Sequence, residues 1–344
     1  MNAPFSPARQ LVLEERPAPS PAGESAFSAR ERLWVMALGA LLALAFCAYY
    51  LKHTWVMNEA DPRLLAQFKG NRPYQLRILM PLLVHWGTQF TGLDVARCYQ
   101  LLLIGFCLAF FRVFTVYLGH FCAPRAANWL GLFLVWPLFA LYSHKWFYLY
   151  DVPAAFFATL ALLLLVQRRF ALYLLVFGLA TLNRETSAFL TLAFALALWD
   201  VLPRRRFVAL VAAQVGIWLV LRALLSHLFA ANPGKPIEWH IADNLSAMAG
   251  LFRAPIPLAL GSALVTLFTL WMMGIATRRA QPEFLRRARG VFWPFLALMS
   301  GVGVLTETRL YSELIPILLA PALIGTFNLI AAPSSSFSAS PSSL

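Results

Sequence analysis

Residues 170–201 read FALYLLVFGLATLNRETSAFLTLAFALALWDV, two apolar runs joined by Asn183-Arg184-Glu185. Each run is longer than an ordinary strand and shows no alternation of polar and apolar residues. Each is therefore predicted to be a helix in an apolar environment. The polar turn between the runs is very short and carries two charged side chains. The stretch predicts a tight helical hairpin within a membrane, with an ionic turn near the membrane surface.

The same pattern recurs through the chain, which has 344 residues of which 60% are hydrophobic and 12% are charged. A soluble domain cannot bury so much apolar surface, so the composition indicates a polytopic membrane protein. Several of the apolar runs are shorter than the roughly 20 residues of an untilted span, and neighbouring helices or a thinner bilayer would have to accommodate them. We predict an all-α transmembrane bundle with about ten spans, at 33–51, 99–118, 127–143, 153–167, 170–183, 186–201, 206–230, 255–277, 290–306 and 311–331.

The two ends of the chain differ in composition from this region. Residues 1–29 and 332–344 are rich in Pro, Ser and Ala and have no apolar pattern. Such segments cannot bury enough apolar surface to fold, so both are predicted to be disordered tails. The transmembrane helical domain is then expected to occupy residues 30–331. The first apolar run is too long for a signal peptide and is predicted to be an uncleaved helix.

Charge predicts the orientation. Alternate loops between the predicted spans lie on the same side of the membrane. Basic clusters at 167–169, 204–206, 278–279 and 286–289 lie in one set of alternate loops, and the acidic loops belong to the other set. Cytoplasmic loops accumulate Lys and Arg. We therefore expect a bacterial inner-membrane protein with both termini in the cytoplasm and the acidic loops outside. This topology requires residues 78–93 to lie in the interface as an amphipathic helix. If that segment spans instead, every later loop changes side.

Several other classes of function are disfavoured. The net charge of +13 comes from short loops between apolar spans, which points to membrane lipids as partners and to no nucleic acid. The four cysteines lie in or beside apolar runs without metal-ligand spacing, so neither a disulfide framework nor a metal site is expected. The six histidines form no metal-binding pattern.

The first outer loop, residues 52–97, is the longest polar insertion and contains Glu59 and Asp61. Two carboxylates this close in sequence could serve as a general base for a hydroxyl group or share a divalent cation. The alternative is a solvated loop in which Asp61, followed by Pro62, begins a helix. The loop leads into the predicted interfacial helix, where a lipid-linked substrate would lie, and this favours a catalytic role.

Asp151 precedes Val152-Pro153 at the outer end of a predicted span. An acidic residue there caps a helix and complements its dipole, so a structural role and a substrate contact are both open. The aromatic residues at 146–148 and 150 fit an interfacial belt, although such rings could also stack on a sugar.

Arg184 and Glu185 occupy the turn quoted above. A charged side chain at mid-bilayer costs roughly 2.5–3.5 kcal/mol, so ionic residues at membrane depth indicate function by default. The alternative is an ion pair that simply closes the hairpin at the surface. The shortness of the hairpin favours a substrate-binding role.

A third ionic segment contains Glu307, Arg309 and Glu313. Arg309 and Glu313 stand four residues apart and would pair on one face of a helix. An arginine held in this way offers a bidentate grip on phosphate. A surface salt bridge of little energetic value is the alternative. Arg112 and Arg222, which lie in apolar runs, are expected to snorkel or to pair with a buried carboxylate.

Together these segments resemble the GT-C superfamily of integral-membrane glycosyltransferases. The resemblance is carried by the layout of residues 33–331, by Tyr74, Arg77 and Pro81, and by the Asn183-Arg184-Glu185 turn. It implies a sugar transferase of the mannosyltransferase type that uses a polyprenyl-phosphate donor.

The resemblance also implies roles for individual residues. An acidic residue of the first outer loop would act as the base. Asp61 is preferred narrowly over Glu59 here, because an aspartate at this point of the loop better fits the family pattern. Arg184, Arg309 and Arg77 would hold the donor phosphate. No cofactor is expected, and a divalent cation is left open. The chain lacks an Asp-x-Asp sequence and a soluble outer domain.

Two other functions fit the same residues. A transporter or flippase of a lipid-linked sugar or small anion would place ionic residues near the midplane within inverted repeats. The sequence shows no convincing repeat, and its charges gather at one face. A polysaccharide polymerase or ligase would use the same outer-face chemistry. The sugar, the acceptor and the oligomeric state are not predicted.

Overall fold

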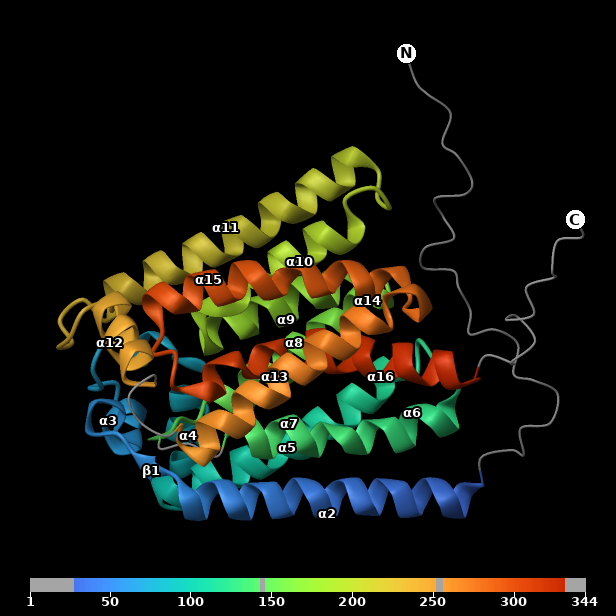
Figure 1. Cartoon of the computed structure of the whole chain (residues 1–344). Helices are drawn as coiled ribbons and strands as arrows, with labels where there is room; N and C mark the ends of the chain where they lie inside the picture. Colours follow the sequence, from blue (N-terminus) through green and yellow to red (C-terminus); the bar gives the residue numbers. More distant parts are fainter. Residues whose placement is uncertain (1–27, 143–145, 252–255, 332–344) are drawn as a thin grey trace, which may run out of the picture.

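The computed structural model describes residues 28–142, 146–251 and 256–331, which form a bundle of helices (Figure 1). The two predicted tails fall almost wholly outside these residues. The all-α prediction is confirmed in the described part, apart from one pair of two-residue strands. These strands, β1 (Trp55–Val56) and β2 (Trp146–Phe147), pair in parallel and join the loop of residues 52–97 to the segment that precedes Asp151.

The helices of the first half of the chain are listed here with their bounds: α2 (Ala29–His53), η2 (Asn58–Ala60), α3 (Pro62–Ala66), η3 (Tyr74–Leu76), α4 (Leu79–Thr91), α5 (Val95–Leu118), α6 (Pro124–Gly131), η4 (Leu132–Leu134), α7 (Val135–Leu141), α8 (Asp151–Val166) and α9 (Phe170–Asn183). Those of the second half are η5 (Glu185–Ser187), α10 (Ala188–Leu198), α11 (Arg204–Leu228), α12 (Ile241–Leu251), α13 (Leu258–Ala276), η6 (Arg278–Ala280), α14 (Glu283–Ala288), η7 (Arg289–Val291), α15 (Phe292–Val302), η8 (Thr308–Leu314) and α16 (Ile315–Ala331). The η elements are 3₁₀ helices.

Five helical segments in the described residues are long and apolar enough to cross a membrane: α2, α5, α11, α13 and η8 with α16. Three shorter apolar segments, which correspond to α8, α9 and η5 with α10, lie among them. The molecule is therefore a helical membrane protein by composition and length, with five of the roughly ten predicted spans long enough to cross unaided.

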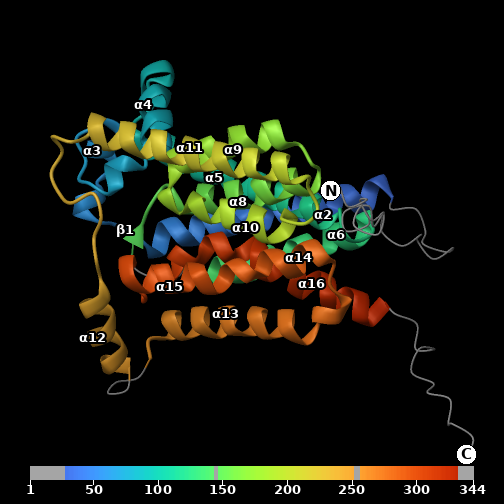
Figure 2. The same cartoon turned by 90° about the horizontal axis from the view of Figure 1, so that it is seen from above.

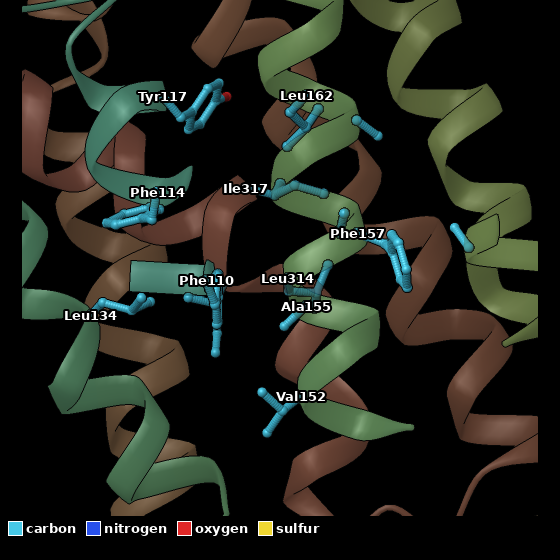
Figure 3. Packing of buried hydrophobic residues seen from close by; sticks show 14 of the residues in the cluster. Phe110, Phe114, Tyr117, Leu134, Val152, Ala155, Phe157, Leu162, Leu314 and Ile317 are labelled. Carbon is cyan, nitrogen blue, oxygen red and sulfur yellow. The ribbon is translucent and has the colours of Figure 1, made fainter. Parts of the chain in front are cut away.

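Helix α8 occupies the centre of the bundle. It is apolar on every side, and most of its residues are buried, as expected for a helix surrounded by others. Phe110 and Phe114 of α5 approach it from one side, and Leu314 and Ile317 of the last apolar segment also pack in this core (Figure 3). By contrast, α11 buries only Gln214 and Leu225 and has little packing around it. The protein thus has a dense centre and a loosely covered flank.

The ends of the bundle differ in charge. The basic clusters gather at what we call the basic end, to which α14 and the first turn of α11 belong (Figure 1). There the Arg206 guanidinium lies 4.9 Å from the centre of the Phe170 ring, and Arg287 pairs with Asp200. The other end, which we call the loop end, carries β1, α3, α4 and α12. Helix α11 joins the two, and at 1.5 Å per residue its 25 residues extend about 37 Å.

Helix α4 covers most of the segment predicted to be interfacial. Its 13 residues are fewer than the roughly 20 that a span needs. It lies at the loop end and runs across the direction of the long helices (Figure 2). Leu79, Met80 and Val84 are buried against the bundle, whereas Leu83, Trp86 and Phe90 are exposed. This placement suits a helix that does not cross the membrane.

Candidate functional site

The site is built around Asp151, the first residue of α8, whose carboxylate is completely buried. Arg309 Nη1 donates a hydrogen bond to its Oδ2 at 2.8 Å, and Arg184 Nη1 lies 3.5 Å from its Oδ1. Both guanidinium groups are buried as well. Charges removed from water in this way persist only when they are paired and hydrogen-bonded. One carboxylate therefore holds together two arginines from segments far apart in the chain.

The predicted hairpin presents Arg184 to this carboxylate. Helix α9 ends at Asn183, whose side-chain amide donates to the Tyr150 carbonyl at 2.9 Å and so fastens the turn to the start of α8. Arg184 is extended, with φ of −161°, before the chain re-enters a helix at η5. The hydroxyls of Thr181 and Ser187 lie 2.9 Å apart across the turn. The ionic turn is thus a buried connection rather than a surface closure.

Glu313 makes a different contact from the one predicted. The expected pair with Arg309 does not form, because Arg309 contacts Asp151 and Glu307 instead. Glu313 lies 3.3 Å from Arg184 and accepts a hydrogen bond of 2.5 Å from the Thr186 hydroxyl. The cause is the local helix type, since η8 is a 3₁₀ helix with three residues per turn. Residues four apart then lie about 120° from one another.

A second ionic layer surrounds Glu185. Arg77 grips the Glu185 carboxylate with two hydrogen bonds, of 2.6 and 3.1 Å, and donates a third to the Tyr150 hydroxyl. Burial alone would lower the pKa of Arg77, but the Glu185 carboxylate raises it well above its ordinary value. Arg222 of α11 lies 3.9 Å from the same carboxylate and donates to the Leu76 carbonyl at 3.1 Å. Arg184 and Glu185, which the sequence suggested as an ion pair, therefore contact different partners: Arg184 lies beside Asp151 and Glu313, and Glu185 lies beside Arg77 and Arg222.

Aromatic rings cover the arginines. The Arg309 guanidinium lies 3.8 Å from the centre of the Tyr148 ring, and that of Arg77 lies 4.5 Å from the Tyr150 ring. Tyr74 stacks on Tyr148 with ring centres 5.5 Å apart. Burial raises the pKa of both Tyr74 and Tyr148, so their hydroxyls stay protonated. Tyr148 and Tyr150, two of the four aromatic residues for which the sequence suggested a membrane belt, are buried beside the ionic network.

A cavity of about 670 Å³ opens beside this network at the loop end. Its volume is in the range of small-molecule sites. Trp218 on α11 and Leu298, Met299 and Val302 on α15 form an apolar part of its wall. The charged residues that line it are Glu59, Arg77, Arg184, Glu185, Arg222, Glu238, Glu307 and Arg309. The cavity therefore combines a cluster of guanidinium groups with an apolar wall.

The two candidate bases lie against different cavities. Glu59, in η2, lines the large cavity beside the arginines. Asp61 caps α3 by accepting a hydrogen bond of 2.8 Å from the Arg63 backbone and lines a second cavity of about 450 Å³. This arrangement does not favour a cation shared by the two carboxylates. No group of three or more His, Cys, Asp or Glu suited to a metal ion occurs among the described residues.

The structure thus brings most of the predicted site residues to one place. Glu59, which lines the cavity, joins this group, and Asp61 stands apart from it. Arg222 was noted in the sequence only as an arginine within an apolar run, yet it lines the cavity. Its neighbours Trp218 and Ser226 line the cavity too, and this spacing of four residues marks one face of a helix. The predicted site residues that gather around the network are Arg77, Asp151, Arg184, Glu185, Glu307, Arg309 and Glu313.

Replacing Asp151 tests the central contact. Asp151→Asn keeps the shape but leaves Arg184 and Arg309 without their shared buried charge, and breaking a buried pair costs about 3–5 kcal/mol. We expect a large fall in the thermal unfolding temperature in detergent. Asp94→Asn is the matched control, because Asp94 pairs with Arg97 on the surface and such pairs contribute about 0–1 kcal/mol. Equal stability of the two variants would contradict the central role of Asp151.

Comparison with protein-family models, curated proteins and solved structures finds no match to this chain. The function of the protein is therefore inferred from the residues and geometry of the site itself.

Proposed function

We propose that this protein is a membrane glycosyltransferase that takes a sugar from a polyprenyl-phosphate donor and passes it to an acceptor hydroxyl. One observation carries the proposal: Arg77, Arg184, Arg222 and Arg309 line a single cavity at one end of an apolar helical bundle. Guanidinium groups bind phosphate with good geometry, and their hydrogen bonds to it are charge-assisted. A phosphate attached to a hydrocarbon chain matches a basic site in such a place.

Arg222 is the arginine best placed to receive the phosphate. Arg77 is engaged twice by Glu185, and Arg309 is engaged by Asp151 and Glu307. The carboxylate contact of Arg222 is long, at 3.9 Å, and its one hydrogen bond in the described structure goes to a backbone carbonyl. Most of its five N–H donors therefore remain for a ligand. The apolar wall formed with α15 suits the first units of the lipid chain.

In the proposed reaction, the acceptor oxygen bonds to the anomeric carbon of the sugar as the bond from that carbon to the donor phosphate breaks. The acceptor proton passes to a carboxylate, and polyprenyl phosphate leaves as an anion held by the arginines. Glu59 is the proposed base because it lines the same cavity. Asp61 is the other candidate and would have to act from the second cavity.

The orientation follows from the two ends of the bundle. Arg222 lies sixteen residues beyond Arg206 on α11, which is a rise of about 24 Å and comparable with the hydrocarbon thickness of a bilayer. We place the basic end in the cytoplasm and the cavity at the outer face of a bacterial inner membrane. In this arrangement the shorter helices α8, α9 and α10 cross the membrane within the bundle, which brings the spans to eight. The segments α6 to α7 and η7 to α15 would supply the other two of the ten proposed spans.

A transporter or flippase fits less well. Such proteins carry their substrate site near the midplane between repeated units. Here the ionic residues gather at the loop end, and the described core beneath them is filled by side chains such as Phe110, Phe114 and Leu314. A polysaccharide polymerase or ligase would use the same cavity. Identification of the acceptor would distinguish it from the proposed glycosyltransferase.

Cysteine accessibility tests the orientation. The native cysteines are all buried, so single added cysteines at exposed positions can be labelled selectively. In right-side-out vesicles, a membrane-impermeant maleimide should label Lys69→Cys and Lys235→Cys at the loop end. It should label Arg205→Cys only after permeabilisation. Labelling of Lys69→Cys and Lys235→Cys from opposite faces would overturn the topology.

A measurement of donor binding tests the proposed role of Arg222 in holding the phosphate. Arg222→Gln removes a charge-assisted contact of about 1.5–3 kcal/mol, so affinity for the lipid-linked sugar should fall about 10- to 150-fold. The measurement is the amount of sugar-phosphate lipid that co-purifies, identified by mass spectrometry. Arg97→Gln is the control, because Arg97 is exposed and is not part of the cavity lining. Undiminished lipid in Arg222→Gln would remove Arg222 from the proposed phosphate site.

Substitution of Glu59 and Asp61 tests which carboxylate is the base. Glu59→Gln keeps the side-chain shape and loses basicity, so sugar transfer to the acceptor should fall about 10²- to 10⁴-fold while donor lipid still co-purifies. Asp61→Asn should retain transfer, since asparagine also caps a helix. Loss of transfer in Asp61→Asn alone would move the base to the second cavity. Full transfer in both variants would argue against the proposed reaction.

A further inference from the structure

Helix α12 takes no part in the proposed reaction, yet it lies beside the large cavity in sequence. It lies at the loop end and runs across the direction of the long helices, on the side of the bundle away from α4 (Figure 2). It follows residues 236–240, which line the large cavity, and the short segment 252–257 separates it from α13. It is therefore tied in sequence both to the cavity and to a candidate span.

In the described part of α12, Asn244 fastens the helix to the bundle. Asn244 donates to the Ser300 carbonyl at 3.0 Å and to the Gly303 carbonyl at 2.7 Å, and it accepts a bond of 2.9 Å from the Leu305 backbone. Among the α12 residues whose burial the structure describes, Asn244 alone is buried. Apolar packing thus does not hold this helix in place.

The exposed surface of α12 is amphipathic. Ile241, Leu245 and Met248 are 53%, 63% and 47% exposed, and their spacing of four and three residues places them on one stripe of the helix. Asp243 and Ser246 lie on the other side, between about 140° and 200° around the axis from Ile241. An amphipathic helix whose apolar stripe is exposed is typical of helices that lie in a membrane interface.

Neighbouring residues point to the same environment. Trp239, just before α12, is 67% exposed, and tryptophan is enriched where membranes meet water. On the other side of the bundle, α4 exposes Leu83, Trp86 and Phe90 at a similar helical spacing and at the same end. The stripe on α12 and the exposed side of α4 are therefore both apolar helix surfaces at the loop end of the bundle.

We propose that α12 lies in the membrane interface at the loop end, with Ile241, Leu245 and Met248 among the lipid acyl chains and Asp243 and Ser246 towards water. The partner is the lipid surface, and the proposal does not depend on the proposed enzymatic activity. It has a consequence for the cavity, because Trp239 and His240 line it immediately before this helix. The lipid-bound helix would fix that part of the cavity wall at headgroup level.

Spin labelling of the full-length protein in phosphatidylethanolamine and phosphatidylglycerol vesicles tests the proposal. Nitroxides are attached to Leu245→Cys, Met248→Cys and, as the matched control on the polar side, Ser246→Cys. Collision with oxygen reports lipid exposure, and collision with a water-soluble nickel chelate reports water exposure. Leu219→Cys on the exposed flank of α11 and Lys235→Cys in the loop supply the lipid and water references.

The expected result is that the oxygen-to-nickel ratio at 245 and 248 shifts towards that of position 219, whereas the ratio at 246 stays near that of position 235. Equal, water-like ratios at all three α12 positions would overturn the proposal. So would protection of 245 and 248 from both reagents with spin–spin broadening that disappears on dilution with unlabelled protein. That result would assign the stripe to a second copy of the chain.

Discussion

The carboxylate of Asp151 is the contact on which the rest of the site depends. It is fully buried at the start of the central helix and accepts contacts from Arg184 and Arg309, which come from the hairpin turn and from the segment before the last helix. Without that charge, two buried guanidinium groups would lose the carboxylate that they share and would keep only Glu313 and Glu307 as partners, at a cost of several kcal/mol. The outer layer of Arg77, Glu185 and Arg222 is built on the same turn. The ionic network thus positions the cavity and also joins α8, α9 and α16.

Much of the fold could be predicted from the sequence, because apolar runs of this length have few stable alternatives to a helix in a membrane. The short runs were harder to interpret. The runs at 153–167 and 170–183 correspond to helices whose length is below that of an ordinary span, and their place in the bundle depends on neighbours that are distant in sequence. The order of the helices along the chain can be predicted from each apolar run by itself, whereas their packing depends on residues far apart in the sequence.

The sequence drew attention to most of the residues that the structure brings together, but it did not predict their contacts. Charged residues at membrane depth are costly, and this made Arg184, Glu185 and Arg309 visible in the sequence. Their partners depended on backbone geometry that spacing does not reveal. The 3₁₀ helix at 308–314 separates Arg309 from Glu313, and Glu59 and Asp61, at and just beyond another 3₁₀ turn, line different cavities. Arg222 escaped selection because a lone arginine in an apolar helix can also snorkel to the surface.

The sparse packing of α11 bears on how its sequence can vary. Its outer surface, which includes Val208, Val215, Leu219 and Val220, is exposed, so the volume of these side chains is not matched to any neighbour. Exchange among Leu, Ile, Val and Phe there is nearly neutral as long as the surface stays apolar. The inner surface is different, because the Gln214 side chain accepts a hydrogen bond of 2.7 Å from Tyr173 and Trp218 donates to the Glu185 carbonyl at 2.9 Å. Among related sequences, residues on the outer side of α11 would vary and those on the inner side would be conserved. This difference would distinguish the residues that face lipid from those that shape the cavity.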